Sequence, residues 1–458
     1  LLYQLFAKEL YKDRPMWGDY LNEMHLIKTS IRMEEFGILT DTRQANKLVK
    51  FLTKEISENR AEMLKMAGKE VNYNSPKQVS ELVYDELGYK CRHFTKGGGR
   101  GVPKEMLLFH REKESHPIFD KILKERAYTK SLSMIASYLE MMNPVTKRMH
   151  PNLRTNQART GRQSCSDPNL QNVSKEISVN TVYGVPARNC FRCDPKHVLF
   201  FIDYAGIEFR LIVDDAGEDE FIEVMANNGD VHDTASAELY AENWDLIEQL
   251  VSSPAGVAIP DWINSIPKED YKDDFKILRY QMRAGAKNYE FGVSYGGAFA
   301  AITKDLIGLN AKEKREGNKR FAKRWPKIHG FTKDRIIQVK KIGYVTTAFG
   351  RKLYVERGKE YIAANYVIQG TAAGILKRAQ NRVDDWSYYE VQDKIRNVVT
   401  VHDELVLSYP REFLPKNDIY LPKIANLMTS FPEIKVPLEV EFEMSHTNWS
   451  NVQEIKVH

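Results

Sequence analysis

The chain has 458 residues, of which 42% are hydrophobic and 28% are charged. This length is enough for about three domains, and the composition is typical of a globular protein. No run of about 18 apolar residues occurs, which excludes a transmembrane helix, and no signal-peptide pattern is visible. The chain opens at Leu1 rather than Met, so we expect the natural N-terminus to lie upstream. Four cysteines are too few for a disulfide framework of this size, which favours a reducing compartment.

The net charge of +5 is unevenly placed, since residues 1–160 carry 28 Lys and Arg against 20 Asp and Glu. Two stretches contain no acidic residue, namely 87–104 and 141–166. A polyanion such as nucleic acid is attracted to basic segments of this kind. A solvated basic surface is the alternative explanation for either stretch taken alone.

The first 140 residues read as a mostly helical, basic arm. Residues 42–70 have apolar residues at helical spacing among many charges, which predicts a long solvated helix. Ser75 is a suitable N-cap with Pro76 at the first helical position, so a second helix is expected to begin there. Residues 118–141 again have a helical pattern.

In the middle of the chain the pattern changes from helical spacing to a short apolar run typical of a strand. Residues 198–202 are rich in β-forming side chains, Asp203 ends the run, and a helical pattern follows from Ile207 to Val213. This pattern predicts a strand that leads into a helix, with a carboxylate at the junction. The region 206–351 is then rich in helical patterns.

A second strand pattern lies near the C-terminus. Residues 398–401 and 405–407 flank His402, Asp403 and Glu404, which predicts a hairpin with two acidic residues at its tip. An aspartate at the end of a strand is commonly a turn or cap residue. If the two predicted strands are neighbours in one sheet, however, the carboxylates meet there and provide the oxygen ligands that Mg²⁺ prefers. Two such ions about 4 Å apart are suited to an in-line phosphoryl transfer.

Four side chains recur at every fourth position around the predicted helix near Lys287. Arg283, Lys287 and Phe291 share one helical face, and Tyr295 follows at the same interval. Two cations beside an aromatic ring suit a triphosphate and a stacked base. An ordinary solvated helix face is the alternative.

Five sequence segments, taken in chain order, resemble the motifs of family A DNA polymerases, the relatives of bacterial DNA polymerase I and of phage replicative polymerases. They are TGRQSCSDPNLQN (160–172), DYAGIEFR (203–210), RAGAKNYEFGVSYG (283–296), NYVIQGTAAGILKRA (365–379) and VHDE (401–404). The resemblance extends over nearly the whole chain, since VNYNSPKQVSEL (71–82), GYVTTAFGRKL (343–353) and EMSHTNW (443–449) also resemble family segments.

The resemblance implies a role for each matching residue in adding deoxynucleotides to a primer 3′-hydroxyl. It implies two Mg²⁺ ions, for which Mn²⁺ can substitute, held by Asp203, Asp403 and the Tyr204 carbonyl, with Glu404 beside them as a further catalytic residue. Lys287 is implied as a general acid. The residues implied to bind the nucleotide are Arg283, Lys287, Phe291, Tyr295, His232 and Glu208. The residues implied to contact the DNA minor groove are Arg162, Asn169, Gln171, Asn365, Gln369 and His402.

The fold that the resemblance implies is a mixed α+β, right-hand polymerase with an antiparallel palm sheet, helical fingers and a helical thumb. The implied domains are an entry segment at 1–40 that follows an upstream exonuclease-like domain, the thumb at 41–140, the fingers at 206–351, and the palm at 141–205 and 352–458. The implied partners are primer–template DNA and deoxynucleoside triphosphates. We expect a monomer without membrane contact, in the cytoplasm of a bacterial or phage-infected cell.

The sequence departs from the family pattern at several positions. Ala205 and Gly206 stand where Ser-Gln is commoner, and Glu290 stands where relatives often have Asn. The interval between His232 and Arg283 is longer than expected, so residues 233–282 contain an insertion in the fingers. A surface insertion is one interpretation, and a docking site for a replication partner is the other.

No Asp-x-Glu occurs in the 458 residues, so the usual start of a 3′–5′ exonuclease metal site is missing and we expect no proofreading site in this chain. Three other functions fit the sequence less well. A single-subunit RNA polymerase is disfavoured by Glu208 and the TGRxS run, and a catalytically dead primer–template binding protein by the intact Asp203 and Asp403. A two-metal nuclease has no use for the helix from Arg283 to Tyr295.

Overall fold

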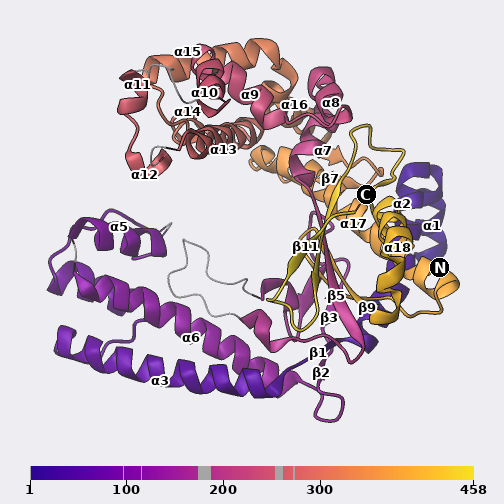
Figure 1. Cartoon of the computed structure of the whole chain (residues 1–458), viewed down its shortest axis with the longest axis horizontal. Coiled ribbons are helices and arrows are strands. Elements are labelled where there is room, and N and C mark those ends of the chain that lie inside the picture. The colour runs from indigo at the N-terminus through magenta and orange to yellow at the C-terminus, as the bar shows by residue number, and fades with distance from the viewer. Residues whose placement is uncertain are drawn as a thin grey trace.

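The computed structural model describes residues 2–95, 97–114, 116–173, 187–252, 261–271 and 274–457. Its elements form three lobes around the middle of the molecule (Figure 1). An antiparallel sheet with its covering helices, here called the sheet lobe, lies between two helical lobes. Both chain ends lie on the sheet lobe (Figure 1).

Two N-terminal helices pack on the sheet lobe. They are α1 (Leu2–Lys12) and α2 (Arg14–Phe36), and β1 (Ile38–Leu39) follows them. The Asp13 side chain accepts a hydrogen bond from the Met16 N–H at 3.3 Å and so caps α2, and Gly37 ends the helix at φ +61°. α2 packs along α17 (Ala363–Glu390), the long helix of the sheet lobe.

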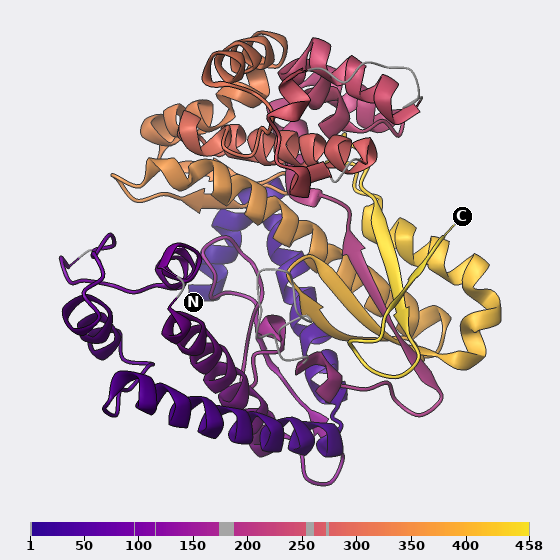
Figure 2. The same ribbon diagram turned by 60° about the vertical axis from the view of Figure 1, so that its left-hand side comes forward.

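The α3–α6 lobe is helical and has its own hydrophobic core. Its helices are α3 (Thr42–Ala67), α4 (Pro76–Ser80), the π-helix η1 (Glu81–Glu86), α5 (Lys104–Glu114) and α6 (Pro117–Met141). α3 and α6 pack against each other and extend away from the sheet (Figures 1 and 2). Met63, Leu107 and Phe119 are fully buried between the helices of this lobe.

The three helices predicted in this arm are confirmed. α3 occupies most of 42–70, α6 covers 118–141, and α4 begins at Pro76 behind the Ser75 cap, as predicted. The Ser75 side chain accepts a hydrogen bond from the Gln78 N–H.

The central sheet has five antiparallel strands in the order β11-β10-β5-β9-β8. Their bounds are β5 (His197–Tyr204), β8 (Arg396–Val401), β9 (Glu404–Pro410), β10 (Val440–Ser445) and β11 (Gln453–Ile455). Side chains alternate between the two faces of β5. Phe200 and Ile202 join the core beneath α17 and α18 (Asn417–Thr429), whereas Leu199 and Phe201 join a second core with Trp449.

Short strands and 3-10 turns connect these parts. The strands pair as β1 with β2 (Arg148–Met149), β3 (Asn152–Arg154) with β4 (Ser164–Ser166), and β6 (Tyr344–Thr346) with β7 (Lys352–Tyr354). The turns are η2 (Leu170–Asn172), η3 (Ala187–Cys190), η4 (Glu360–Ile362) and η5 (Arg411–Lys416).

The α7–α16 lobe is helical and lies above α17, on the opposite side from α3 and α6 (Figure 2). Phe321 and Trp325 are fully buried in its core. Its helices are α7 (Ile207–Ala216), α8 (Asp219–Ala226), α9 (Val231–Tyr240), α10 (Glu242–Ser252), α11 (Asp261–Asn264), α12 (Lys268–Tyr271), α13 (Phe275–Ser294), α14 (Phe299–Ile302), α15 (Ala311–Arg324) and α16 (Pro326–Ile342).

The predicted mixed fold with an antiparallel sheet is confirmed, and three local details differ. β5 continues one residue beyond Asp203, to Tyr204. The hairpin tip contains only His402 and Asp403, because Glu404 already pairs with Val401 as the first residue of β9. Tyr295 is the C-cap of α13 and not part of the helix.

Candidate active site

The two aspartates predicted as metal ligands lie at one end of the central sheet. Asp203 of β5 is the in-register partner of Glu404 of β9, and Asp403 lies in the two-residue loop before Glu404. Directly opposed residues on neighbouring strands project from the same face of a sheet. All three side chains line one cavity of about 400 Å³. The condition stated for the two strand patterns is therefore met: β5 and β9 are neighbours, and the two distant sequence segments come together.

The donor set of this cavity fits magnesium. Among the described residues, no group of three or more His, Cys, Asp or Glu side chains is arranged to hold a metal ion alone. Mg²⁺ does not require such a cage, because it keeps several waters and binds through one or two carboxylates together with substrate phosphates. Asp203 and Asp403 provide two carboxylates at one cavity, and all the predicted donors are oxygen atoms.

Sequence reasoning missed a carboxylate beside Asp203. Glu441 of β10 is the in-register partner of Asp203 on the side away from Glu404, and its side chain is exposed. Three acidic residues thus stand in one row across β9, β5 and β10. No local motif marks Glu441, since its place depends on the register of strands that are far apart in the chain.

A buried arginine in the same cavity was also missed. Arg188 of η3 is 6% exposed and stacks on the Trp449 ring, with the guanidinium carbon 4.9 Å from the ring centroid. Its Nε donates a hydrogen bond to the Val173 carbonyl at 3.3 Å. Burial lowers the pKa of Arg188, and the nearby carboxylates of Glu404 and Glu443 oppose this shift. Arg188 thus adds positive charge on the side of the cavity lined by Glu404.

A smaller cavity of about 70 Å³ adjoins this site through Asp403 and His402. It brings together Arg162, Gln171 and His402, three residues predicted to contact DNA, with the α17 residues Ala372, Ala373, Leu376, Lys377 and Gln380. The Gln171 amide donates to the Gln163 carbonyl at 3.3 Å and to Thr400 Oγ1 at 3.5 Å. The predicted DNA-contacting polar residues therefore converge next to Asp403.

The other residues predicted to contact DNA do not line either cavity. Asn169 accepts a hydrogen bond from the Gln171 N–H at 3.1 Å, so its side-chain oxygen caps η2. Asn365 and Gln369 are half-buried on α17. They precede Ala373 at successive four-residue intervals, which places them on the same stripe of the helix as the small cavity.

Glu208 connects Tyr295, which was predicted with it to bind the nucleotide, to Arg162, which was predicted to contact DNA. It lies in the first turn of α7, five residues after Asp203 in the chain. Its Oε1 accepts a hydrogen bond from Arg162 at 3.2 Å, and its Oε2 accepts one from the Tyr295 hydroxyl at 3.2 Å. Burial, followed by the Glu208 charge, raises the pKa of Tyr295. The polar network thus extends from the sheet end to the end of α13.

An aromatic contact joins two further predicted residues. The Phe291 ring of α13 lies 5.5 Å from the Phe209 ring, and the Phe209 ring lies 5.4 Å from the His232 ring of α9. His232 also contacts the buried Glu290 carboxyl through Nδ1. α7, α9 and α13 therefore position these side chains jointly.

The two cations of α13 that were predicted to bind the triphosphate differ in their partners. Arg283 Nε donates to Asp230 Oδ2 at 2.7 Å, and the guanidinium also lies 3.5 Å from Asp233. Lys287 is exposed and forms no ion pair with the residues that the structure describes. A triphosphate would therefore compete with Asp230 for Arg283 but would meet Lys287 directly.

The acid-free stretches acquire acidic partners from remote segments. Arg100 pairs with Asp85 at 2.5 Å, while Arg148 pairs with Asp194 and Arg159 with Glu356. Arg162 pairs with Glu208. Local charge composition alone thus overestimated the free positive charge of these stretches; Lys96 lies outside the described residues.

The segment 233–282, which was predicted to contain an insertion, contributes to the core of the α7–α16 lobe and is more than a surface addition. Trp244, Ile247 and Leu250 of α10 and Ile263 of α11 are buried, at 0–3% exposure. Residues 253–260, 272 and 273 of this segment lie outside the described residues.

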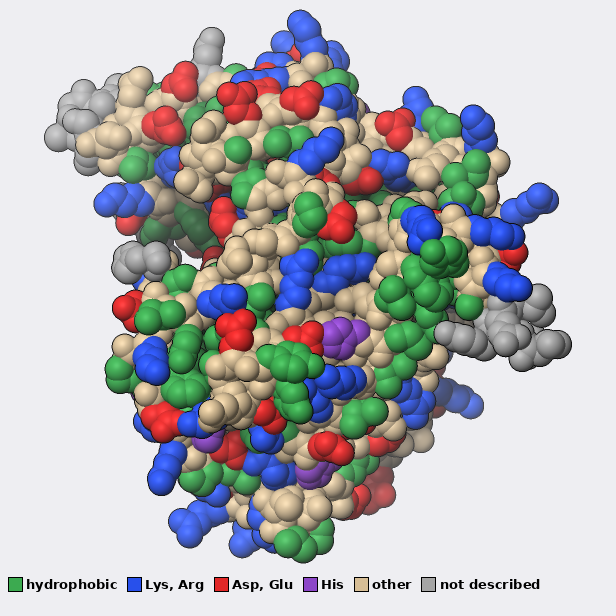
Figure 3. All heavy atoms as spheres, turned by 90° about the vertical axis from the view of Figure 1, so that its right-hand side faces the viewer, with side chains coloured by type: hydrophobic (Ala, Val, Ile, Leu, Met, Phe, Trp, Pro, Cys, Tyr) green, Lys and Arg blue, Asp and Glu red, His purple; other side chains and the backbone are tan. Residues whose placement is uncertain are grey.

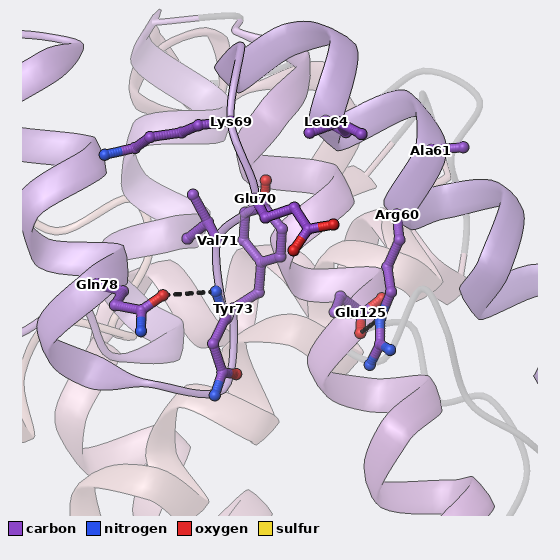
Figure 4. Close-up of a pocket in the computed structure, with 10 residues that line it drawn as sticks. Arg60, Ala61, Leu64, Lys69, Glu70, Val71, Tyr73, Gln78 and Glu125 are labelled. Atoms are coloured by element: carbon purple, nitrogen blue, oxygen red, sulfur yellow. Dashed lines mark hydrogen bonds and ion pairs between the residues drawn. The ribbon is translucent and has the colours of Figure 1, made fainter.

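A larger cavity of about 660 Å³ lies in the α3–α6 lobe, where sequence reasoning predicted no catalytic residue (Figure 4). Arg60 on α3 projects toward Glu125 on α6, and its Nε lies 2.7 Å from Glu125 Oε1. Glu125 is 1% exposed, so this pair neutralises a buried carboxylate. The Asn72 N–H donates to the Gln78 side chain at 2.7 Å across the cavity wall. These groups satisfy one another, and the predicted chemistry lies elsewhere.

Among the described residues, no helix is both long enough and apolar enough to cross a membrane. On the face shown in Figure 3, Lys and Arg side chains lie interspersed with acidic and hydrophobic side chains. The four cysteines are free thiols.

Comparison with known proteins identifies the family. The model of DNA polymerase family A matches residues 42–250 and 266–451. The chain is 28% identical over 456 residues to the thermostable DNA polymerase I of Thermus aquaticus, covering 97% of this chain and 49% of that protein. It is 30% identical over 443 residues to DNA polymerase I of Caldicellulosiruptor bescii, covering 93% of this chain and 46% of the relative. The chain thus spans about half the length of these relatives.

A solved structure has the same fold. The polymerase domain of Pol1 from M. smegmatis, in complex with a DNA primer-template and dNTP, matches with a TM-score of 0.75 at 23% identity, covering 93% of this chain and 70% of that chain. The expected right-hand polymerase fold is therefore confirmed. Because the family model matches most of the sequence, the chain belongs to DNA polymerase family A.

Proposed function

We propose that this chain is a template-directed DNA polymerase that adds deoxynucleotides to a primer 3′-hydroxyl, with no 3′–5′ proofreading site within these 458 residues. The observation that carries the proposal is the convergence of Asp203 and Asp403 on one cavity, next to the Arg162–Glu208–Tyr295 network. Family membership supports it, and so does the similar Pol1 domain, which was solved in complex with a DNA primer-template and dNTP.

In this proposal Asp203, Asp403 and the Tyr204 carbonyl hold two Mg²⁺ ions, and Glu404 supports them from the neighbouring strand. When bound, the ions would lower the pKa of the primer hydroxyl and neutralise charge on the phosphates. The hydroxyl gives its proton to water, and its oxygen forms a bond to the α-phosphorus while the bond from that phosphorus to the oxygen bridging to the β-phosphate breaks. Lys287 donates a proton to the departing pyrophosphate.

The remaining roles follow from the side-chain chemistry. Arg283 and His232 bind the triphosphate by charge and hydrogen bonding, and Phe291 packs against the sugar. Glu208 excludes a ribose 2′-hydroxyl, because its carboxylate is already held in place by two donors at 3.2 Å. Tyr295 stands near the templating base.

Primer–template DNA would contact the minor-groove set Arg162, Asn169, Gln171, Asn365, Gln369 and His402. The minor groove presents nearly the same acceptors for every base pair, so these residues would check pair geometry without reading sequence. We assign the thumb to 41–140, the fingers to 206–351 and the palm to 141–205 and 352–458, with 1–40 as the entry segment. We also propose that the protein is a monomer and acts in a reducing cytoplasm.

We also propose that a replication partner docks on 233–282, through the exposed side chains of this segment only. The buried residues of α10 and α11 belong to the core, so only the exposed side chains of the insertion are available to a partner. Deleting the segment would disturb the core, whereas changing its exposed charges would not.

Extension of a labelled DNA primer on a longer template tests the proposed function. The four deoxynucleotides are supplied singly with Mg²⁺, opposite each template base, and the four ribonucleotides are supplied in parallel. We expect incorporation of the complementary deoxynucleotide alone. Comparable use of ribonucleotides would contradict the DNA assignment, and tight primer–template binding without extension would favour a non-catalytic binding protein.

A further inference from the structure

A histidine and a buried glutamate form a close pair in the α7–α16 lobe. His232 lies in the first turn of α9, which Asp230 caps by accepting a hydrogen bond from the His232 N–H at 2.8 Å. Its Nδ1 contacts Oε2 of Glu290 on α13, whose side chain is 0% exposed. The Phe209 ring lies 5.4 Å from the imidazole. The imidazole is therefore held by one polar contact and one aromatic neighbour.

The second oxygen of Glu290 indicates where the proton lies. Glu290 Oε1 is buried and accepts no hydrogen bond from the residues that the structure describes. A buried ionised carboxylate with one bare oxygen is costly, whereas a neutral acid needs only a partner for its O–H. Nδ1 of His232 is that partner.

The charges around the pair agree with this location. Burial raises the pKa of Glu290 well above its usual value, and the Asp230 carboxylate raises it further, while Arg283 and Lys287 lower it. Burial lowers the pKa of His232. Arg283, Lys287 and Arg210 also lower the pKa of His232, and Asp230 raises it.

The position of this proton determines whether Nε2, on the other edge of the imidazole, donates or accepts a hydrogen bond. A neutral histidine has one N–H, so when Nδ1 accepts a hydrogen bond from Glu290, the hydrogen lies on Nε2. The ion-pair form of the same pair, His⁺ with Glu⁻, also has a hydrogen on Nε2. If the pair loses its shared proton, Glu290 is ionised and accepts a hydrogen bond from Nδ1 of the neutral imidazole. The single N–H of His232 is then at Nδ1, and Nε2 can only accept a hydrogen bond. Phosphate oxygens accept hydrogen bonds. They therefore bind Nε2 only in the two forms that keep the shared proton, the neutral pair and the ion pair.

We propose that Glu290 is a positioning residue that shares one proton with His232 and thereby keeps His232 Nε2 as a hydrogen-bond donor to the triphosphate of the incoming nucleotide. This inference rests on the proposed function, in which His232 binds that triphosphate. It assigns Glu290 no contact with the nucleotide, since the side chain is fully buried. Its consequence is a nucleotide affinity that falls as the pH rises through the titration of the pair.

The test compares the KM for one deoxynucleotide, in single-nucleotide primer extension, between the wild type and Glu290→Gln from about pH 5.5 to about pH 9.5. The glutamine amide can donate to Nδ1 but cannot ionise. We expect the wild-type KM to rise relative to that of Glu290→Gln by about tenfold toward high pH, as expected for loss of one hydrogen bond to a charged group, with kcat changing far less. Glu248→Gln is the matched control, because Glu248 pairs with Arg279 at 3.4 Å at the protein surface.

His232→Ala completes the test. The pH-dependent difference between Glu and Gln at position 290 should vanish in that background, because Glu290 acts through His232. A difference that persists there, or a wild-type KM that does not rise relative to Glu290→Gln, would overturn the inference. If Glu290→Gln does not fold, the comparison of wild type with His232→Ala decides, since the rise in KM at high pH should be absent from His232→Ala. A wild type that extends no primer would refute the proposed function itself.

Discussion

The contact between α2 and α17 depends on a buried lysine, and Glu23→Gln tests this dependence. Lys377 is 2% exposed, and its Nζ lies 2.7 and 3.0 Å from the two Glu23 carboxylate oxygens and 3.1 Å from the Thr155 carbonyl. Burial lowers the pKa of Lys377, and the Glu23 charge opposes this shift. Arg351 also donates to Glu23. Removing the Glu23 charge therefore leaves the positive charges of Lys377 and Arg351 with less opposite charge nearby.

The expected loss of stability can be worked from this geometry. Breaking a buried ion pair typically costs about 3–5 kcal/mol, and glutamine retains an oxygen that can accept from Lys377, so we expect about 2–3 kcal/mol. The unfolding entropy is about 2.1 cal/mol/K per residue, or about 1 kcal/mol/K for a chain of this length. Glu23→Gln should then lower the Tm by about 2–3 °C if the chain unfolds as one unit, and by about twice as much if the sheet lobe unfolds separately.

Thermal unfolding followed by circular dichroism measures this shift. The matched control is Glu9→Gln, because Glu9 pairs with Lys12 at the surface with both side chains at least 70% exposed. Its Tm should change by less than about 1 °C. The double variant Glu23→Leu with Lys377→Met should recover part of the loss, because it removes Lys377 together with Glu23, while Arg351 keeps Asp19 as a partner at 2.7 Å. A Glu23→Gln shift no larger than that of the control would show that the Glu23 charge does not stabilise the buried Lys377.

Three further predictions concern the site and its packing. Asp403→Ala should slow single-turnover primer extension by at least about 10³-fold, or about 4 kcal/mol, with primer–template affinity nearly unchanged; near-normal extension would refute the metal assignment. Glu208→Ala should increase incorporation of ribonucleotides relative to deoxynucleotides, and an unchanged ratio in competition assays would remove its role as the sugar filter. Gly285→Ala should lower the Tm of unfolding, since its Cβ would lie 2.3 Å from the Asp305 carbonyl oxygen and would cost about 1–3 kcal/mol; an unchanged Tm would show that the backbone there can shift.

Much of the fold could be predicted because its signals are local. α3 and α4 each begin directly after a residue whose side chain caps the helix, and α3 also contains apolar residues at helical spacing, so a few positions of sequence indicate where each helix starts. β5 likewise appears as one apolar run before Asp203. The order of the strands in the sheet has no such local signal, because β5 pairs with β9 and β10 from the far end of the chain.

The same distinction explains which site residues were found. Asp203 and Asp403 each end or adjoin an apolar strand, so pattern and family order both indicated them. Glu441 and Arg188 reach the same end of the sheet only through register and tertiary packing, which no short segment encodes. Glu290 was noted as a departure from the family, but its burial against His232 required the structure.

We infer that Asp203 holds a catalytic metal in the proposed DNA polymerase. Single-turnover extension of a labelled primer with Mg²⁺ tests it most directly, comparing the wild type with Asp203→Ala and with the control Asp219→Ala, whose side chain is 91% exposed. We predict templated extension by the wild type and the control, and at least about 10³-fold slower extension by Asp203→Ala with intact primer–template binding. Extension by Asp203→Ala at the rate of the control would show that Asp203 holds no catalytic metal.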